Sequence, residues 1–359
     1  MTNALVDAAG KGDVAAVRQI LAAGADVNYT KEGDDGETAL WRAAYHGHLE
    51  AALALIDAGA DVDKGRTDVG ATPLYMAVQE NRLQVVQALI DAGADVDKGV
   101  TTDGSTPLNI AAQKNQLQVV LALIGAGADV NKGLTTTLGT PLFMAAQKNH
   151  LQVVQALIDA GADVDKGKTT NGCTPLFIAA QNNHLQAVQV LIDAGADVDK
   201  GLTTTGCTPL FVAVVENHPH IVQVLVAAGA NVNFRVAGQT PLLNAAYLGH
   251  LEIVQILVEN GAELDVTDDD GNTPLRIAEL NGHQEVVKFV ERHAKLVEKE
   301  NAADSAAEAL LAELDAEEDA KSKKKKTKKK KKKKKADPIE EVAGEGKLKD
   351  RVAVLREVL

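Results

Sequence analysis

The sequence predicts an all-α repeat solenoid, in which stacked helix-turn-helix units are joined by β-hairpin-like fingers and followed by a low-complexity helical or disordered tail. Three observations carry this prediction. The first two are that a Thr-Pro-Leu tripeptide recurs every 32 to 34 residues, and that Gly-Ala followed by Asp, Asn or Glu recurs between its copies. A third is the composition, because only 3% of the 359 residues are aromatic. One thick core would need more large side chains, so many small packing layers are expected.

The first helix of each unit is expected to begin directly after a threonine. Thr72 is placed to cap such a helix, and Pro73 takes the first helical position, where its missing N–H costs nothing. The helix should end at Asn81, because its equivalents are all Asn or Gly, which tolerate a left-handed backbone. These equivalents are Gly47, Asn115, Asn149, Asn183, Asn217, Gly249 and Gly282.

The second helix is expected from Leu83 to about Ala92, and Gly93 ends it. Its expected inward side chains are Leu83, Val86, Leu89 and Ile90. Helices of about ten residues are marginal in isolation, so each pair needs a neighbouring pair to cover its apolar face. Residues 95–104 are rich in turn-forming and β-branched residues and should form the finger that leads to the next unit.

A longer motif runs through residues 1–295: Thr-Pro-Leu-x-x-Ala-Ala-x-x-Gly/Asn-His-Leu, then Val-Val/Ile-x-x-Leu-Ile/Val, then Gly-Ala-Asp-Val-Asn/Asp. It resembles the motif of the ankyrin-repeat family. Counting an N-terminal capping unit at residues 4–28 and a terminal unit from Thr273, we expect nine repeats. The residue after Thr-Pro-Leu departs from the family, in which it is usually His. Here this position holds Trp41, Tyr75, Asn109, Phe143, Phe177, Phe211, Leu243 and Arg276.

Five aromatic residues share that position, and two interpretations are open. They could pack in the seam between successive first helices, which we favour because aromatic burial mainly serves packing. Alternatively they could form a hydrophobic strip that lines a concave groove. The five residues are Trp41, Tyr75, Phe143, Phe177 and Phe211.

The resemblance also implies where a partner protein would bind. In ankyrin-like arrays a partner is usually held on the concave side by the finger tips and the exposed ends of the first helices. Carried over to this chain, the helix sites are Tyr45, His46, Gln79, Glu80, Gln113, Lys114, Gln147, Lys148, Gln181, Asn182, Val215 and Glu216, followed by Tyr247 and Leu248. Gln recurs in four consecutive units. The alternative is that these are solvated polar residues copied by duplication.

No arrangement typical of catalysis, of a cofactor or of a metal site is expected. Residues 162–169 fit a relaxed phosphate-binding loop, but neither the strand nor the helix that this loop requires is predicted beside it. Cys173 and Cys207 stand 34 residues apart in neighbouring units and are expected to be free thiols. Six histidines occupy one turn position in successive units and are interpreted as structural: His48, His150, His184, His218, His250 and His283.

Charge is distributed unevenly along the chain. Residues 1–295 contain 35 acidic and 19 basic residues, whereas residues 321–335 alone contain thirteen lysines. A regular lysine row in the fingers is interpreted as a solvated edge that the preceding Asp or Asn neutralises. The row is Lys64, Lys98, Lys132, Lys166 and Lys200.

The C-terminal region is expected to hold three segments. Residues 296–320 predict an acidic helical linker, residues 321–335 a disordered poly-lysine segment, and residues 336–359 a short amphipathic helix. The run from Lys323 to Lys335 has three interpretations: a nuclear address, a grip on nucleic acid or an anionic surface, or low-complexity expansion without a role.

These patterns favour a nonenzymatic scaffold or adaptor that binds a partner protein in a concave groove and uses its basic tail for localisation. The alternative is a nucleic-acid or ribosome-associated factor that contacts polyanion through the lysine run. We expect no transmembrane segment, a location in the cytoplasm, the nucleus or both, and a monomer. Weak self-association through the C-terminal helix is the alternative to the monomer.

Overall fold

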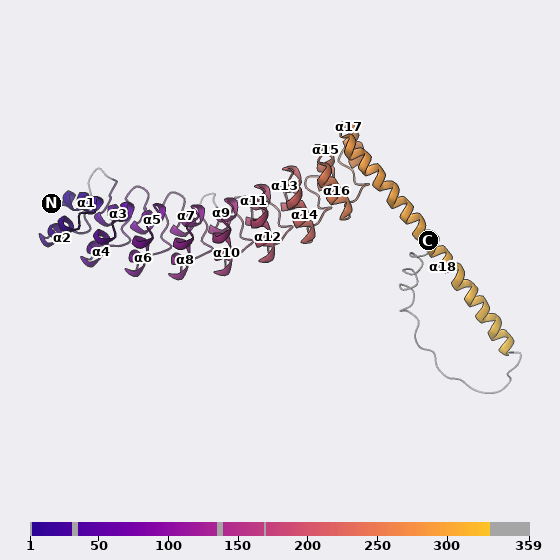
Figure 1. Ribbon diagram of the computed structural model, residues 1–359, viewed down its shortest axis with the longest axis horizontal. Helices are drawn as coiled ribbons and strands as arrows, with labels where there is room; N and C mark the ends of the chain where they lie inside the picture. The colour runs from indigo at the N-terminus through magenta and orange to yellow at the C-terminus, as the bar shows by residue number, and fades with distance from the viewer. Residues whose placement is uncertain (1, 31–34, 135–138, 169, 331–359) are drawn as a thin grey trace. The chain divides into compact units, whose positions relative to one another are not determined.

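The computed structural model describes residues 2–30, 35–134, 139–168 and 170–330, which contain eighteen helices and no strand (Figure 1). The prediction of an all-α repeat fold is confirmed. The first helices of the pairs are α1 (Thr2–Lys11), α3 (Ala39–His46), α5 (Pro73–Gln79), α7 (Pro107–Gln113), α9 (Pro141–Gln147), α11 (Pro175–Gln181), α13 (Pro209–Val215), α15 (Pro241–Leu248) and α17 (Pro274–Leu280). The second helices are α2 (Val14–Ala22), α4 (Leu49–Asp57), α6 (Leu83–Asp91), α8 (Leu117–Gly125), α10 (Leu151–Asp159), α12 (Leu185–Asp193), α14 (Pro219–Ala227) and α16 (Leu251–Glu259).

The backbone divides into two units, residues 1–286 and residues 287–359. In the first unit the first helices stand in one row and the second helices in another (Figure 1). Each helix packs against its partner in the pair and against its neighbours in the same row. Fully buried leucines and small alanines fill the space between them, as Leu142 and Ala145 do in α9. Successive pairs thus cover one another's apolar faces, as expected of a solenoid.

A threonine caps every first helix from α3 onward. In α5 the Thr72 hydroxyl oxygen accepts from the Tyr75 N–H at 3.1 Å, and Pro73 follows at the first helical position. Each such cap satisfies a backbone donor that the helix itself leaves unpaired. The predicted helix starts are confirmed at Thr38, Thr72, Thr106, Thr140, Thr174, Thr208, Thr240 and Thr273.

The turns after the first helices also follow the prediction. Asn81 has φ +55°, and all seven equivalent Asn or Gly residues likewise have positive φ. This left-handed backbone reverses the chain direction within two residues, so that the second helix can pack against the first.

The inward face of α6 agrees with the prediction at Val86 and Leu89, whereas Ile90 is only half-buried and Leu83 is exposed. In α6 the buried side chains are Val85, Val86 and Leu89, whereas Leu83 is 39% exposed. Leu83 is the first residue of the helix, directly after the turn, so it lies at the edge of the packed face. Residues two positions apart lie on nearly opposite sides of a helix, and the packed side of α6 is the one that carries Val85, Val86 and Leu89.

Where the structure describes them, the fingers are hairpin-like turns that form no strand. In one finger the Lys168 N–H donates to the Cys173 carbonyl at 2.9 Å, and the Gly172 N–H donates back to the Lys168 carbonyl at 2.8 Å. Adjacent fingers also bond to each other, as when the Thr203 N–H donates to the Asn171 carbonyl at 2.9 Å. The segment that resembles a phosphate-binding loop is therefore a finger, and α11 begins only at Pro175, beyond it.

A ladder of hydrogen bonds links the bases of successive fingers and corrects our interpretation of the lysine row. The Lys98 ammonium donates to the Asp63 carbonyl of the preceding repeat at 2.8 Å, while the Asp63 carboxylate accepts from the Asp95 N–H at 3.0 Å. The lysines therefore join repeats through backbone oxygens instead of pairing with the residue before them. The same lysine bond occurs at Lys64, Lys132 and Lys166.

The last helix, α18 (Gln284–Lys330), runs without a break across the boundaries predicted at residues 295 and 320. Residues 296–320 contain neither Pro nor Gly and are rich in Ala, Glu and Leu, which favour helix. Lysine is itself a good helix former, so the helix continues through residues 321–330, for which the sequence predicts disorder. Residues 331–335 and the predicted helix at residues 336–359 lie outside the described residues.

Candidate partner-binding groove

The last turn of each first helix presents one side chain to the surface between the first helices and the fingers. We call this surface the groove, and the side chains seven positions after each capping threonine the end row. The end row is Tyr45, Gln79, Gln113, Gln147, Gln181, Val215, Tyr247 and Leu280. The four glutamines are half-buried, whereas Val215 is 41% exposed, Tyr247 58% and Leu280 60%.

The second residue of each predicted binding pair stands at the end of the first helix, beside the end row. Two of these residues form hydrogen bonds to the preceding repeat and so help to hold the repeats together. The Lys114 ammonium donates to the Gln79 carbonyl at 2.8 Å, and the Asn182 amide donates to the Gln147 carbonyl at 3.1 Å. The predicted second residues are His46, Glu80, Lys114, Lys148, Asn182 and Glu216, all of which are exposed except the half-buried Glu80.

The turn histidines also hold neighbouring repeats together. His184 Nε2 lies 3.1 Å from the Gln147 carbonyl oxygen, and His218 Nε2 lies 3.1 Å from that of Gln181. His283 repeats this contact with Tyr247 at 2.9 Å. Each ring forms a hydrogen bond with a carbonyl at the end of a first helix. The helix itself has no N–H group that could pair with that carbonyl. Among the described residues no cluster of metal-ligating side chains occurs.

The aromatic row is mostly part of the core. Trp41 is 4% exposed, Tyr75 8%, Phe143 0% and Phe177 4%, and only Phe211 is half-buried. Most of these side chains therefore fill the seam between successive first helices, although Trp41 also lines a hollow of the groove. This outcome agrees with the favoured of the two interpretations.

The cysteines are free thiols in the fingers, as predicted. Cys173 is buried, and this burial raises the pKa of its thiol to about 11, although the neighbouring Lys168 opposes the shift. Burial also raises the pKa of Cys207. A thiol with a pKa of about 11 contains little of the reactive thiolate at neutral pH, so Cys173 lacks the character of a reactive cysteine.

A hollow of about 450 Å³ opens in the groove near the N-terminal end of the repeats. Its aromatic wall is a stack of Trp41 on Tyr45, with ring centroids 5.5 Å apart. The Arg66 guanidinium carbon lies 5.5 Å from the Trp41 ring centroid and pairs with Asp35 and Asp68 at 2.6 and 2.7 Å. The hollow is lined by Glu37, Trp41, Arg42, Tyr45, His46, Arg66, Met76 and Gln79.

His46 lines this hollow, and its pKa is lower than that of a free histidine. Partial burial lowers its pKa, and the nearby His48, Arg42 and Arg82 lower it further. A neutral imidazole both donates and accepts hydrogen bonds, so this side chain suits polar contacts with a partner rather than ion pairing.

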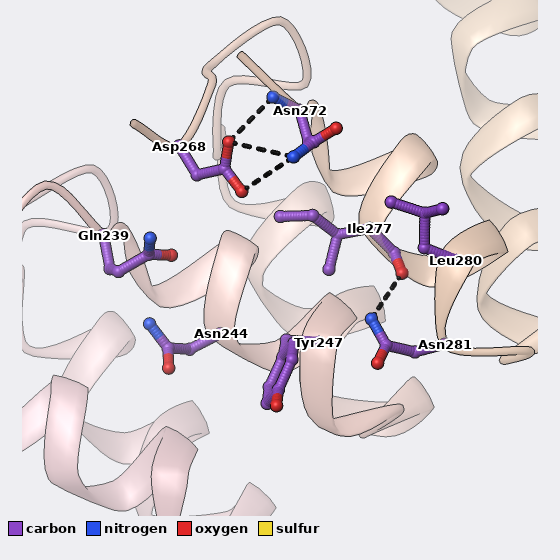
Figure 2. A pocket seen from close by; sticks show the side chains of 8 residues that line it. All are labelled: Gln239, Asn244, Tyr247, Asp268, Asn272, Ile277, Leu280 and Asn281. Atoms are coloured by element: carbon purple, nitrogen blue, oxygen red, sulfur yellow. Dashed lines mark hydrogen bonds between the residues drawn. The ribbon is translucent and has the colours of Figure 1, made fainter. Parts of the chain in front are cut away.

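A second hollow, of about 380 Å³, lies between α15, α17 and the fingers before them (Figure 2). Tyr247, Ile277 and Leu280 line it, and the Asn244 side chain lies on the Gln239 side of it. On the finger, the Asp268 carboxylate accepts from the Asn272 N–H at 2.7 Å and from the Asn272 amide at 3.2 Å. These bonds fix the finger and hold the pKa of Asp268 below its usual value.

The repeat pattern seen in the fold is matched by a comparison with known families. The sequence model for ankyrin repeats, which spans three copies, matches residues 5–100, 63–134, 96–168, 142–236 and 233–300. The chain is an ankyrin-repeat protein. No match to it was found among curated proteins. Ankyrin repeats are general modules of protein-protein interaction, so the array implies protein partners.

Sequence reasoning missed two residues of the ankyrin groove. Leu280 lies seven positions after Thr273, and applying the same offset to the last repeat would have found it. Asn244 interrupts a row of apolar residues four positions after the capping threonines, a signal that was visible without a structure. The row is Arg42, Met76, Ile110, Met144, Ile178, Val212, Asn244 and Ile277.

Among the described residues of the ankyrin-repeat protein, no helix combines the length and the apolar character needed to cross a membrane.

Proposed function

We propose that the protein is a nonenzymatic adaptor that holds a partner protein in the groove between its first helices and fingers. The observation that carries this proposal is the end row. The first helices bury most of their side chains in the repeat core, while the end row keeps one side chain per repeat open to the groove. Eight such side chains in register offer an extended, segmented surface that suits a protein better than a small molecule.

The chemistry of the groove supports binding rather than catalysis. The charged side chains of the first hollow are engaged with one another: Glu37 pairs with Arg42, and Arg66 lies between Asp35 and Asp68. Such pairs hold the walls of the hollow in place, and the aromatic stack beside them offers contact area. We therefore assign these residues to positioning and contact.

In this proposal the lysine-rich segment controls the location of the adaptor by acting as a nuclear address. Its thirteen lysines are separate in sequence from the groove. The run from Lys323 to Lys335 lies outside the residues whose side chains the structure describes.

The experiment changes three glutamines of the end row, Gln113, Gln147 and Gln181, to Glu. These side chains are half-buried at the surface, so stability should change by less than about 0.5 kcal/mol per site, while new negative charge should weaken binding to polar or acidic partners. Partners retained by the tagged full chain and by the triple variant are compared by affinity purification and mass spectrometry.

A matched control places the same charge change on the second helices of the same three repeats, with Gln118, Gln152 and Gln186 changed to Glu. All three control residues are exposed and lie in the first helical turn, where acidic side chains are well tolerated. Loss of partners with the groove variant alone supports the proposal. Loss with the control variant alone places the interface on the second helices and contradicts it.

A further inference from the structure

The end row changes character over the last three repeats of the array. Four glutamines occupy the middle repeats, but Val215, Tyr247 and Leu280 follow, with 41%, 58% and 60% of their surface exposed. The fold does not demand apolar residues there, because glutamine fills the same position four times elsewhere. Exposed neighbouring apolar side chains on a folded surface are typical of sites that another molecule covers.

A polar group lines the same hollow as two of these side chains, Tyr247 and Leu280. Asn244 stands where most other repeats carry Met, Ile or Val, and it lines the hollow with its amide toward the Gln239 side (Figure 2). Its Nδ2 is buried and has no hydrogen-bond partner among the described residues. A buried donor without an acceptor is unfavourable, and the fold could have avoided it with an apolar residue. An acceptor from a bound molecule would satisfy it.

The finger beside the hollow is acidic. Asp268 is held in its ionised form by donors from Asn272 and from the Asp270 N–H, and Asp269 and Asp270 are exposed. The nearby cations are engaged elsewhere. Arg235 donates to the carbonyl oxygens of Gly238 and Thr267.

The second nearby cation, Arg276, pairs with Glu279 at 3.0 Å. The hollow therefore has an apolar wall, an unsatisfied donor in its floor and a negatively charged rim. A ligand complementary to all three features carries a large apolar group, a hydrogen-bond acceptor and a positive charge.

We propose that this hollow binds an extended segment of a partner protein in which a large apolar side chain stands next to a Lys or Arg. A backbone carbonyl of the segment accepts from Asn244 Nδ2, the apolar side chain lies between Tyr247 and Leu280, and the cationic side chain lies against the Asp268 finger. The inference rests on the proposed function, because it specifies which part of the groove recognises the partner and by what chemistry.

The test uses a display library of random twelve-residue peptides, selected on the full chain. The selected peptides are then measured against Asn244→Leu and Leu280→Gln. Both variants install the kind of residue that other repeats carry at the same position, so they should fold, and thermal unfolding checks this. Leu185→Gln, at an exposed leucine of the second helix α12, is the matched control.

The expected result is a selected set in which a large apolar residue stands within two positions of Lys or Arg. Each peptide should bind Asn244→Leu and Leu280→Gln about tenfold more weakly than the original chain, which corresponds to one lost buried contact, and Leu185→Gln should bind unchanged. Raising the salt concentration should weaken binding further, because the acidic rim contributes.

Equal binding to the original chain and to both variants would overturn the inference. If those peptides are instead lost on the triple Glu variant of Gln113, Gln147 and Gln181, the groove is still the binding surface and only the assignment to this hollow fails. A library that yields no peptide also overturns the inference, whereas the adaptor proposal is then judged by its own purification experiment.

Discussion

At the scale of single residues, the turn after each first helix depends on a backbone conformation that few residues adopt. Asn149 is exposed and has φ +59°, so its contribution is conformational rather than one of packing. Asparagine tolerates the left-handed region better than other residues with a Cβ, and glycine tolerates it fully.

We therefore expect Asn149→Ala to destabilise the array by about 1 kcal/mol, because alanine adopts this conformation at a steric cost. Asn149→Gly should stay within about 0.5 kcal/mol of the original, since glycine loses only chain entropy. Thermal unfolding of the two variants measures the difference. Equal melting temperatures would mean that the turn does not limit stability at this site.

The sequence indicated where the residues of the turns and fingers lie, but it did not reveal all of their hydrogen-bond partners. The histidines were correctly placed in the turns between the helices, yet their carbonyl acceptors lie 36 to 38 residues away in the preceding repeat. That separation reflects the repeat length plus a few residues, so only the packed array brings the atoms together. The lysines of the fingers were misinterpreted for the same reason.

At the scale of elements, helix starts and stops were predictable because caps and turns are local. Thr72, Pro73 and Asn81 each act within a few residues of their own position. The burial of the second helices is less local, since it depends on which neighbour covers each side chain. Leu83, which was expected to face inward, is therefore exposed, while Val85 is buried.

The different burial of Val86 and Leu83 supplies a prediction in which Leu83 is the control position. Val86→Asp in α6 buries an unpaired carboxylate between repeats, where Val86 is 0% exposed, and should cost several kcal/mol. Leu83→Asp adds the same charge at a 39% exposed position and should cost about 1 kcal/mol or less. Urea unfolding followed by circular dichroism separates the two. A larger loss for Leu83→Asp would reverse the inward face seen here.

Some features of the groove could likewise be predicted from local sequence, whereas others depend on contacts between repeats. The end row follows directly from the repeat register, so Tyr45 and Gln79 could be placed from the sequence. The hollows could not, because each is formed by two first helices and the fingers between them. Asn244 becomes a candidate binding residue only once the packed repeats show that its Nδ2 has no hydrogen-bond partner within the described part of the chain.

At the scale of the whole molecule, the repeats and the lysine-rich segment carry opposite charges. Residues 1–295 have 35 acidic against 19 basic residues, and residues 321–335 hold thirteen lysines. Close to the lysine run, Lys321 pairs with Glu317 at 3.1 Å along α18. The acidic residues just upstream are too few to neutralise the run, namely Glu313, Asp315, Glu317, Glu318 and Asp319.

A positive field therefore remains available to a receptor, a nucleic acid or an anionic surface, and the acidic repeats compete for it within the same chain. The stability of the repeats should nevertheless not depend on the lysine-rich segment. Each repeat buries its apolar face against the next, so the array needs no contribution from the lysine-rich segment to fold.

Deleting residues 321–335 should thus leave the thermal unfolding of the repeats within about 2 °C of the original, because no packed repeat is touched. The same deletion should shift a tagged protein from the nucleus toward the cytoplasm. It should also abolish salt-sensitive retention on heparin, because thirteen positive charges are lost. A matched variant in which the lysines are changed to Gln keeps the length of the segment. It therefore separates the effect of the lost charge from the effect of shortening the chain. An unchanged distribution with undiminished heparin binding would remove the lysine run from the adaptor's function and leave that function to the repeats.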